Sequence, residues 1–317
     1  MPRLENIDLL RGIGIFLVLL GHLPINGDVH MLIYTFHMPL FFFCSGLFFK
    51  KRSFSEQIIK DLKSILVPYL FFLTILVGTI LGMSIVHTHS ISQAVAALNL
   101  NPLDSQCYPI YHTIWFLICM FFVKEFFNLV YTRNTLKTSV LAGGGYVLAQ
   151  VLAYQHIRLP FFIDTAFGLT IFYAAGFYYK NSNFADMKVK CYIPFAILLA
   201  YIVCMLYISP FVNTSDNDYP WYLCISAMIP IISFYYLSGA LSNHTSSVLG
   251  FMKRCGRSSL FIFALHGPIF EVMFPLMNKL NATDIIQTIV LLIVAIPLCQ
   301  FSERIINKYA PFLIGKF

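Results

Sequence analysis

Two residues whose types and spacing could do chemistry lie near the start of the chain. They are Arg11 and His22, the ends of the stretch RGIGIFLVLLGH, with only uncharged residues between them. Eleven positions correspond to three helical turns plus roughly 20°, so in a helix both side chains share one face, roughly 16 Å apart. A guanidinium binds anions, and a neutral imidazole with a pKa near 6.5 accepts protons. The spacing predicts an anion-binding end and a proton-accepting end on one helix face.

Asp8 and His37 extend this pattern. Asp8 lies three residues before Arg11, the spacing of a same-face ion pair, although Arg11 could equally anchor a helix end by snorkelling. His37 lies in the next apolar run, at a depth within a turn or two of that of His22. The short loop between the two runs makes them antiparallel neighbours. We therefore expect the two imidazoles to form a pair.

Other polar or aromatic side chains lie in or beside later apolar runs. His266 is in the middle of a run and is followed by Gly-Pro, which we expect to break the helix there. Asp164 and His112 lie at the outer ends of two runs, and Trp115 follows His112 closely. Because an ionisable group at membrane depth costs several kcal/mol unless it is paired or hydrated, we treat the three ionisable residues as candidates for binding an acceptor, and Trp115 as an aromatic side chain that could dock a sugar.

The composition places the chain in a membrane. Apolar residues make up 58% of the 317 residues, charged residues 11%, and the mean hydropathy is +0.76. The net charge of +7 is explained by the placement of basic residues and predicts no nucleic-acid partner. We expect an all-α polytopic protein, a single transmembrane domain over residues 1–317 without a separate soluble domain. Its ten predicted spans are 7–24, 30–49, 65–86, 113–131, 138–156, 160–179, 190–209, 220–240, 258–277 and 284–302.

The basic residues orient these spans. If the spans alternate, 19 of the 21 Lys and Arg residues fall on one side, which the positive-inside rule makes cytoplasmic. We expect a multi-pass protein of the inner or plasma membrane with both termini in the cytoplasm. The eight cysteines include no Cys-x-x-Cys pair, so we expect neither a metal site nor a disulfide framework.

Five stretches resemble the membrane acyltransferase 3 family, and they run in order over roughly residues 5–270. The stretches are ENIDLLRGIGIFLVLLGH, FHMPLFFFCSGLFF, TIWFL, DTAFGLTIFYAAGFYYK and GRSSLFIFALHGPIF. Within the family, the chain resembles the compact, fucose 4-O-acetylase-like sugar O-acetyltransferases of bacteria. The resemblance implies an enzyme that moves an acyl group, usually acetyl, from cytoplasmic acyl-CoA to a hydroxyl of a glycan or glycolipid in the cell envelope, working beside membrane lipid and polysaccharide biosynthesis machinery.

The resemblance also implies roles for individual residues. The family's first-helix arginine and histidine fall on Arg11 and His22, and its second-helix histidine falls on His37. His22 would be the general base, with His37 orienting it or sharing that role. Arg11, fixed by Asp8, would hold the CoA phosphates, and an extended pantetheine arm would span the roughly 16 Å to His22.

A basic stretch after the second span is the further donor-binding candidate: Lys50, Lys51 and Arg52. The chain departs from the family here. Some members carry an Arg-x-x-Arg motif, whereas this chain has Lys60 and Lys63, which lack the guanidinium fork.

Two other functions fit the same residues. Intramembrane His, Arg and Asp would also serve a polytopic transporter or a flippase for glycans or small solutes, although the halves of the chain show no matched broken helices. A scaffold subunit of a polysaccharide synthase would need neither histidine. Acetyl-CoA bound or hydrolysed by the purified protein would favour the enzyme.

Overall fold

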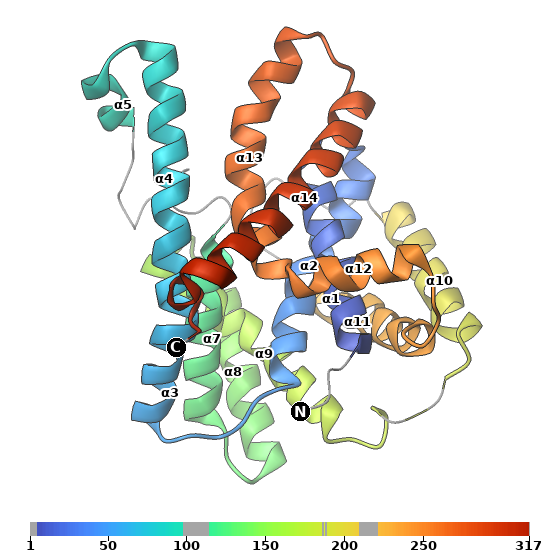
Figure 1. Ribbon diagram of the computed structural model, residues 1–317. Coiled ribbons are helices and arrows are strands. Elements are labelled where there is room, and N and C mark those ends of the chain that lie inside the picture. Colours follow the sequence, from blue (N-terminus) through green and yellow to red (C-terminus); the bar gives the residue numbers. More distant parts are fainter. Residues whose placement is uncertain (1–4, 98–113, 186, 188, 209–220, 317) are drawn as a thin grey trace. The chain divides into compact units, whose positions relative to one another are not determined.

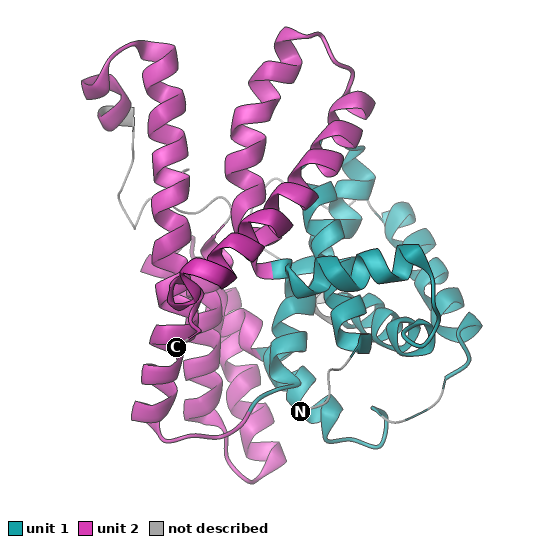
Figure 2. Cartoon of the chain, viewed as in Figure 1, with its two compact units in different colours: residues 1–49, 171–259 teal, residues 50–170, 260–317 magenta. Residues whose placement is uncertain are grey.

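The computed structural model describes residues 5–97, 114–185, 187, 189–208 and 221–316. All regular secondary structure in these residues is helical (Figure 1), which confirms the predicted fold class. The chain divides into two compact units (Figure 2), residues 1–49 with 171–259 and residues 50–170 with 260–317. The single domain predicted for residues 1–317 stays a prediction.

The first unit contains both ends of the RGIGIFLVLLGH stretch. Its helices are α1 (Glu5–Gly21), α2 (Gly27–Gly46), the last part of α9 (Ile163–Lys180), α10 (Tyr192–Ile208), α11 (Trp221–Leu241) and α12 (Ser247–Arg257).

The second unit begins just after α2. Its elements are α3 (Phe54–Asp61), a π-helical turn η1 (Leu62–Leu66), α4 (Val67–Thr88), α5 (Ile91–Ala97), α7 (Trp115–Val130), α8 (Thr135–Tyr154), a 3-10 turn η2 (Pro160–Phe162), the start of α9, α13 (Ser259–Lys279), α14 (Asp284–Tyr309) and a 3-10 turn η4 (Pro311–Ile314).

The helices are those of a multi-pass membrane protein. Among the described residues, six helices are long and apolar enough to cross a membrane, and two shorter apolar helices accompany them. Their outer faces are apolar, as Phe195, Leu199 and Val203 on α10 and Ile289 and Ile293 on α14 show by their exposure. A soluble protein rarely exposes such continuous apolar surface, and lipid tails are its natural solvent.

Each of the ten predicted spans overlaps a helix. Three of these helices are shorter than the others, α1 and α10 with 17 residues and α7 with 16, and α1 and α7 also carry charged side chains. The amphipathic helices α3 and α12 lie between the predicted spans, where no helix was expected. Their charged residues keep their average hydropathy low, so a search for apolar runs passes over them.

In the first unit, α1 and α12 touch through backbone atoms. A Cβ on Gly12 would overlap the Met252 carbonyl oxygen, and a Cβ on Gly256 would overlap the Asp8 carbonyl oxygen. The Lys253 ammonium also donates to the Glu5 carboxylate at 2.6 Å. The start of α1, from Glu5 to Gly12 and including Arg11, is therefore fixed against α12.

A second close crossing joins α2 to α9. A Cβ on Gly46 would overlap the Tyr173 carbonyl oxygen, and a Cβ on Gly176 would overlap the Phe43 carbonyl oxygen. Small residues let membrane helices approach in this way. The crossing brings Phe49 edge-on to Phe177, with ring centres 5.3 Å apart. The end of α9 therefore lies beside the chain segment that leaves α2.

In the second unit, α3, η1 and α4 form one continuous helical run. Ser53 and Glu56 cap its start with reciprocal hydrogen bonds, and these bonds lower the pKa of the exposed Glu56 carboxyl. Pro68 has no N–H to donate to the Ser64 carbonyl. One residue earlier, the Val67 N–H bonds to the Leu62 carbonyl in the wider π pattern.

Candidate active site

His22 and His37 each use one ring nitrogen within their own helix. The Nδ1 of His22, just after α1, lies 2.9 Å from the Val18 carbonyl oxygen, and the Nδ1 of His37 lies 2.8 Å from the Ile33 carbonyl oxygen. A carbonyl oxygen only accepts, so each Nδ1 carries a proton and donates it. A neutral ring held this way has its lone pair on Nε2. Both imidazoles therefore have the tautomer in which Nε2 is the basic nitrogen.

The structure brings these two histidines to a common neighbour, Tyr34 on α2. The Tyr34 ring centre lies 6.2 Å from that of His22 and 4.8 Å from that of His37. A third imidazole, His30, stacks on Tyr34 with ring centres 3.9 Å apart. Sequence reasoning missed His30 and Tyr34, although spacings of four and three along α2 place both on the face of His37.

Arg11 lies towards the other end of α1, beside a partly exposed aromatic ring. Its guanidinium carbon is 5.7 Å from the centre of the Phe48 ring, and the Lys180 ammonium, from the end of α9, is 5.2 Å from the same centre. Cations are attracted to an aromatic face but repel each other. An anion bound beside both would reduce this repulsion. Sequence reasoning missed Lys180 as a neighbour of Arg11.

Asp8 lies one turn before Arg11, where its carbonyl oxygen contacts Gly256 of α12. Its side chain is partly buried. The ion pair expected between Asp8 and Arg11 stays a prediction.

In the second unit, the predicted donor-binding residues lie on the segment that leads into α3. The Lys51 ammonium donates to the Asn128 carbonyl oxygen near the end of α7, where a helix dipole favours a cation. The Asn128 side chain also exchanges hydrogen bonds of 3.2 Å with the Arg52 backbone. The Arg52 guanidinium donates to the Lys50 carbonyl at 3.2 Å and to the Gln57 side chain at 3.3 Å. This basic segment is therefore fastened to α7 and α3.

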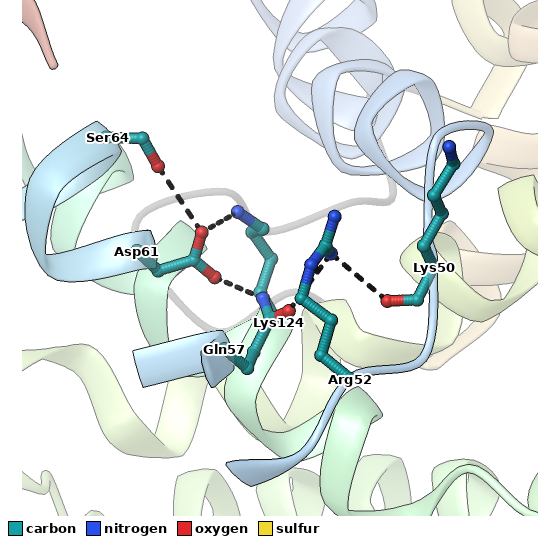
Figure 3. Close-up of polar contacts among 6 residues, drawn as sticks. All are labelled: Lys50, Arg52, Gln57, Asp61, Ser64 and Lys124. Carbon is teal, nitrogen blue, oxygen red and sulfur yellow. Dashed lines mark hydrogen bonds and ion pairs between the residues drawn. The ribbon is translucent and has the colours of Figure 1, made fainter. Parts of the chain in front are cut away.

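Figure 3 shows the contacts beside this segment, where Gln57 also bonds to Asp61, a buried carboxylate on α3 that sequence reasoning did not single out. Asp61 accepts hydrogen bonds from the Lys124 ammonium, the Gln57 amide and the Ser64 hydroxyl. It is 0% exposed, so Lys124 supplies the opposite charge that burial requires. Burial and the charge of Lys124 lower the pKa of Lys60 on α3.

The proposed acceptor residues that the structure describes all lie in the second unit. Asp164 is buried at the start of α9, where it accepts hydrogen bonds from the Arg158 guanidinium at 3.4 Å and the Leu159 N–H at 3.3 Å. These bonds give its burial a structural reason. Trp115 packs against Phe162, with ring centres 5.6 Å apart. His112 lies outside the described residues.

His266 is fully buried in α13. Its Nδ1 lies 2.7 Å from the Phe263 carbonyl oxygen and 3.0 Å from that of Ile262. The expected helix break after it is wrong, because α13 continues through Gly267 and Pro268. Neighbouring groups in a membrane bundle can compensate for the hydrogen bond that a proline omits, so the helix persists.

The described fold defines a class, the multi-pass helical membrane proteins, with imidazoles and cations gathered at opposite ends of one helical hairpin. Residues 4–304 match the profile of the acyltransferase domain of the acyltransferase 3 family. This match covers nearly the whole chain, and the chain belongs to that family. No curated protein and no solved structure matches it. Family membership implies that the protein is an acyltransferase with an acyl donor and an acceptor.

Proposed function

We propose that the protein is an O-acetyltransferase that moves an acetyl group from acetyl-CoA to a hydroxyl of a sugar in a cell-surface glycan, exopolysaccharide or glycolipid. The observation that carries the proposal is the arrangement along α1. Cations gather around Phe48 near Arg11, and two imidazoles with basic Nε2 atoms gather around Tyr34 near the other end of α1. Helical rise separates the two ends by roughly 16 Å, the order of length of an extended pantetheine arm.

Arg11 and Lys180 hold phosphates of the donor in this proposal. Arg11 offers a planar fork that matches phosphate oxygens, and Lys180 adds a point charge beside the same aromatic ring. Lys50, Lys51 and Arg52 are further donor candidates. Of these, Lys51 is already bonded to the Asn128 carbonyl, so we expect it to contribute least.

The reaction uses an imidazole as general base. Nε2 of His22 removes the proton from the sugar hydroxyl as its oxygen attacks the thioester carbonyl carbon. The tetrahedral intermediate then collapses, the C–S bond breaks, and the proton passes from the imidazole to the departing thiolate. His37 orients His22 or shares its role. The products are an O-acetyl ester and CoA, and no proton is gained or lost.

The reaction would bring together a donor and an acceptor that lie on opposite sides of the cell membrane. We propose that both termini are cytoplasmic, since 19 of the 21 Lys and Arg residues then fall on the cytoplasmic side. The nucleotide of the donor would stay in the cytoplasm while its thioester reaches an outward-facing acceptor.

Purified protein tests the proposal directly. In detergent with acetyl-labelled acetyl-CoA and glycan extracted from the source membrane, we expect label to move to the glycan as an alkali-labile ester. A succinyl donor run in parallel establishes which acyl group is used. A polytopic transporter or flippase, the alternative function, would instead move solute across proteoliposomes. If the protein neither bound nor turned over any acyl-CoA, that result would contradict the proposal.

A further inference from the structure

Tyr34 is an aromatic neighbour that His22, His30 and His37 of the first unit share. Its ring is stacked on His30, tilted against His37 at 59° and tilted against His22 at 40°. His30 is exposed, Tyr34 is partly buried and His37 is 2% exposed. The ring therefore extends from the surface of α2 to the buried imidazole of His37, and it also lies beside His22, which directly follows α1.

A glycine on α1 makes room for this ring. A Cβ on Gly21 would lie 2.9 Å from Tyr34 Cε2 and 3.3 Å from Ile33 Cγ2. The first distance is shorter than a Cβ normally allows, so a larger residue at position 21 would push the ring away from α1. Because Gly21 immediately precedes His22, this close approach places the phenol ring next to the proposed base.

The imidazoles need such a neighbour. Each donates from Nδ1 to a carbonyl oxygen of its own helix, and these two hydrogen bonds tie each ring to its helix but do not tie the two rings to each other. A base must point at the hydroxyl it deprotonates, and a misplacement of about 1 Å can cost about 100-fold in rate. Tyr34 lies beside both rings, so its ring can fix them relative to each other.

We propose that Tyr34 is a positioning residue: its ring, held against α1 at Gly21, sets the orientation of the His22 and His37 imidazoles for acyl transfer. This inference rests on the proposed function. It assigns the positioning role to the aromatic ring of Tyr34. It assigns no proton transfer to the phenol hydroxyl. Tyr34→Phe should therefore preserve activity, and Tyr34→Leu should lose it.

Steady-state kinetics with acetyl-CoA and the glycan acceptor test the inference. For Tyr34→Leu we expect kcat to fall about 10- to 100-fold while KM for acetyl-CoA stays within about twofold, because the donor phosphates bind near Arg11. For Tyr34→Phe we expect both values to stay near those of the wild type. A Tyr34→Leu variant with wild-type kcat would overturn the inference. A Tyr34→Phe variant as impaired as Tyr34→Leu would also overturn it, since the hydroxyl would then be the active part.

Gly21→Ala perturbs the same ring from the other helix, and Gly27→Ala is its matched control. A Cβ on Gly27, at the start of α2, meets nothing within 4 Å. We expect Gly21→Ala to lower kcat as Tyr34→Leu does, and Gly27→Ala to leave it unchanged. Equal activity in the two glycine variants would count against the inference. So would loss of folding in both Tyr34→Leu and Gly21→Ala, because the contact would then serve stability alone.

His22→Ala separates this inference from the proposed function. If His22→Ala is inactive and Tyr34→Leu is fully active, the inference about Tyr34 fails and the proposed function stands. If His22→Ala is fully active, the assigned base is wrong and the inference falls with it.

Discussion

Gly256 on α12 lies so close to Asp8 on α1 that a Cβ on Gly256 would overlap the Asp8 carbonyl oxygen. The neighbouring contact between Gly12 and Met252 makes the crossing reciprocal. Arg11 lies between the two contact points on α1. An amphipathic helix that the hydropathy pattern does not reveal therefore sets the position of the proposed phosphate-binding cation.

The close crossing of α1 and α12 predicts that Gly256→Ala lowers the stability of the protein. The added methyl group must push α12 away from α1, and overpacking of this kind costs about 1–3 kcal/mol. We expect a lower unfolding temperature in detergent and weaker binding of acetyl-CoA. Gly250→Ala on the same helix is the control, because its Cβ would meet only the Arg254 side chain, at 3.7 Å. It should be neutral or slightly stabilising. Equal stability of the two variants would show that the crossing is not tight.

The burial of Asp61 predicts a large loss of stability when its cationic partner, Lys124, is replaced by an uncharged residue. Lys124→Met leaves a fully buried carboxylate without its counter-charge, which costs about 3–5 kcal/mol. We expect a marked drop in the unfolding temperature, partly restored in the double variant Lys124→Met with Asp61→Leu. Lys137→Met, an exposed lysine on α8, should change little. If Lys124→Met and Lys137→Met unfold at the same temperature, the ion pair contributes nothing.

The cations around Phe48 predict losses in donor affinity. Arg11→Ala removes a charge-assisted hydrogen bond worth about 1.5–3 kcal/mol, so the Kd for acetyl-CoA should rise roughly 10- to 150-fold. Arg11→Lys should recover part of the loss, and Lys180→Ala should weaken binding less than Arg11→Ala does. Lys190→Ala, also exposed and in the same unit, should leave the Kd unchanged. Calorimetry giving a wild-type Kd for Arg11→Ala would remove Arg11 from the donor site.

Local pattern accounts for the features that could be predicted. The lengths of the apolar runs located all ten helices that were expected as spans, because a helix needs about 20 mostly apolar residues to cross the hydrocarbon core of a bilayer. Gly46, where α2 meets the Tyr173 backbone, is a small residue of the kind that such close packing requires. The spacing of Arg11 and His22 likewise follows from helical rise alone.

Features that depend on tertiary contacts could not be predicted in this way. The meeting of Lys180 with Phe48, and of Lys124 with Asp61, joins helices far apart in the sequence. No local periodicity encodes such pairs. Tyr34 is different, because a helical projection of α2 places it on the face of His30 and His37, so its neighbourhood with these imidazoles follows from sequence spacing alone.

The central claim is that His22 acts in chemistry and Arg11 acts in donor binding, and one comparison tests it most directly. Purified wild type and His22→Ala are each saturated with acetyl-CoA, and acetyl transfer to the glycan is followed in a single turnover. We predict that His22→Ala binds acetyl-CoA with the wild-type Kd and transfers acetyl at least about 100-fold more slowly. Transfer by His22→Ala at the wild-type rate would contradict the account.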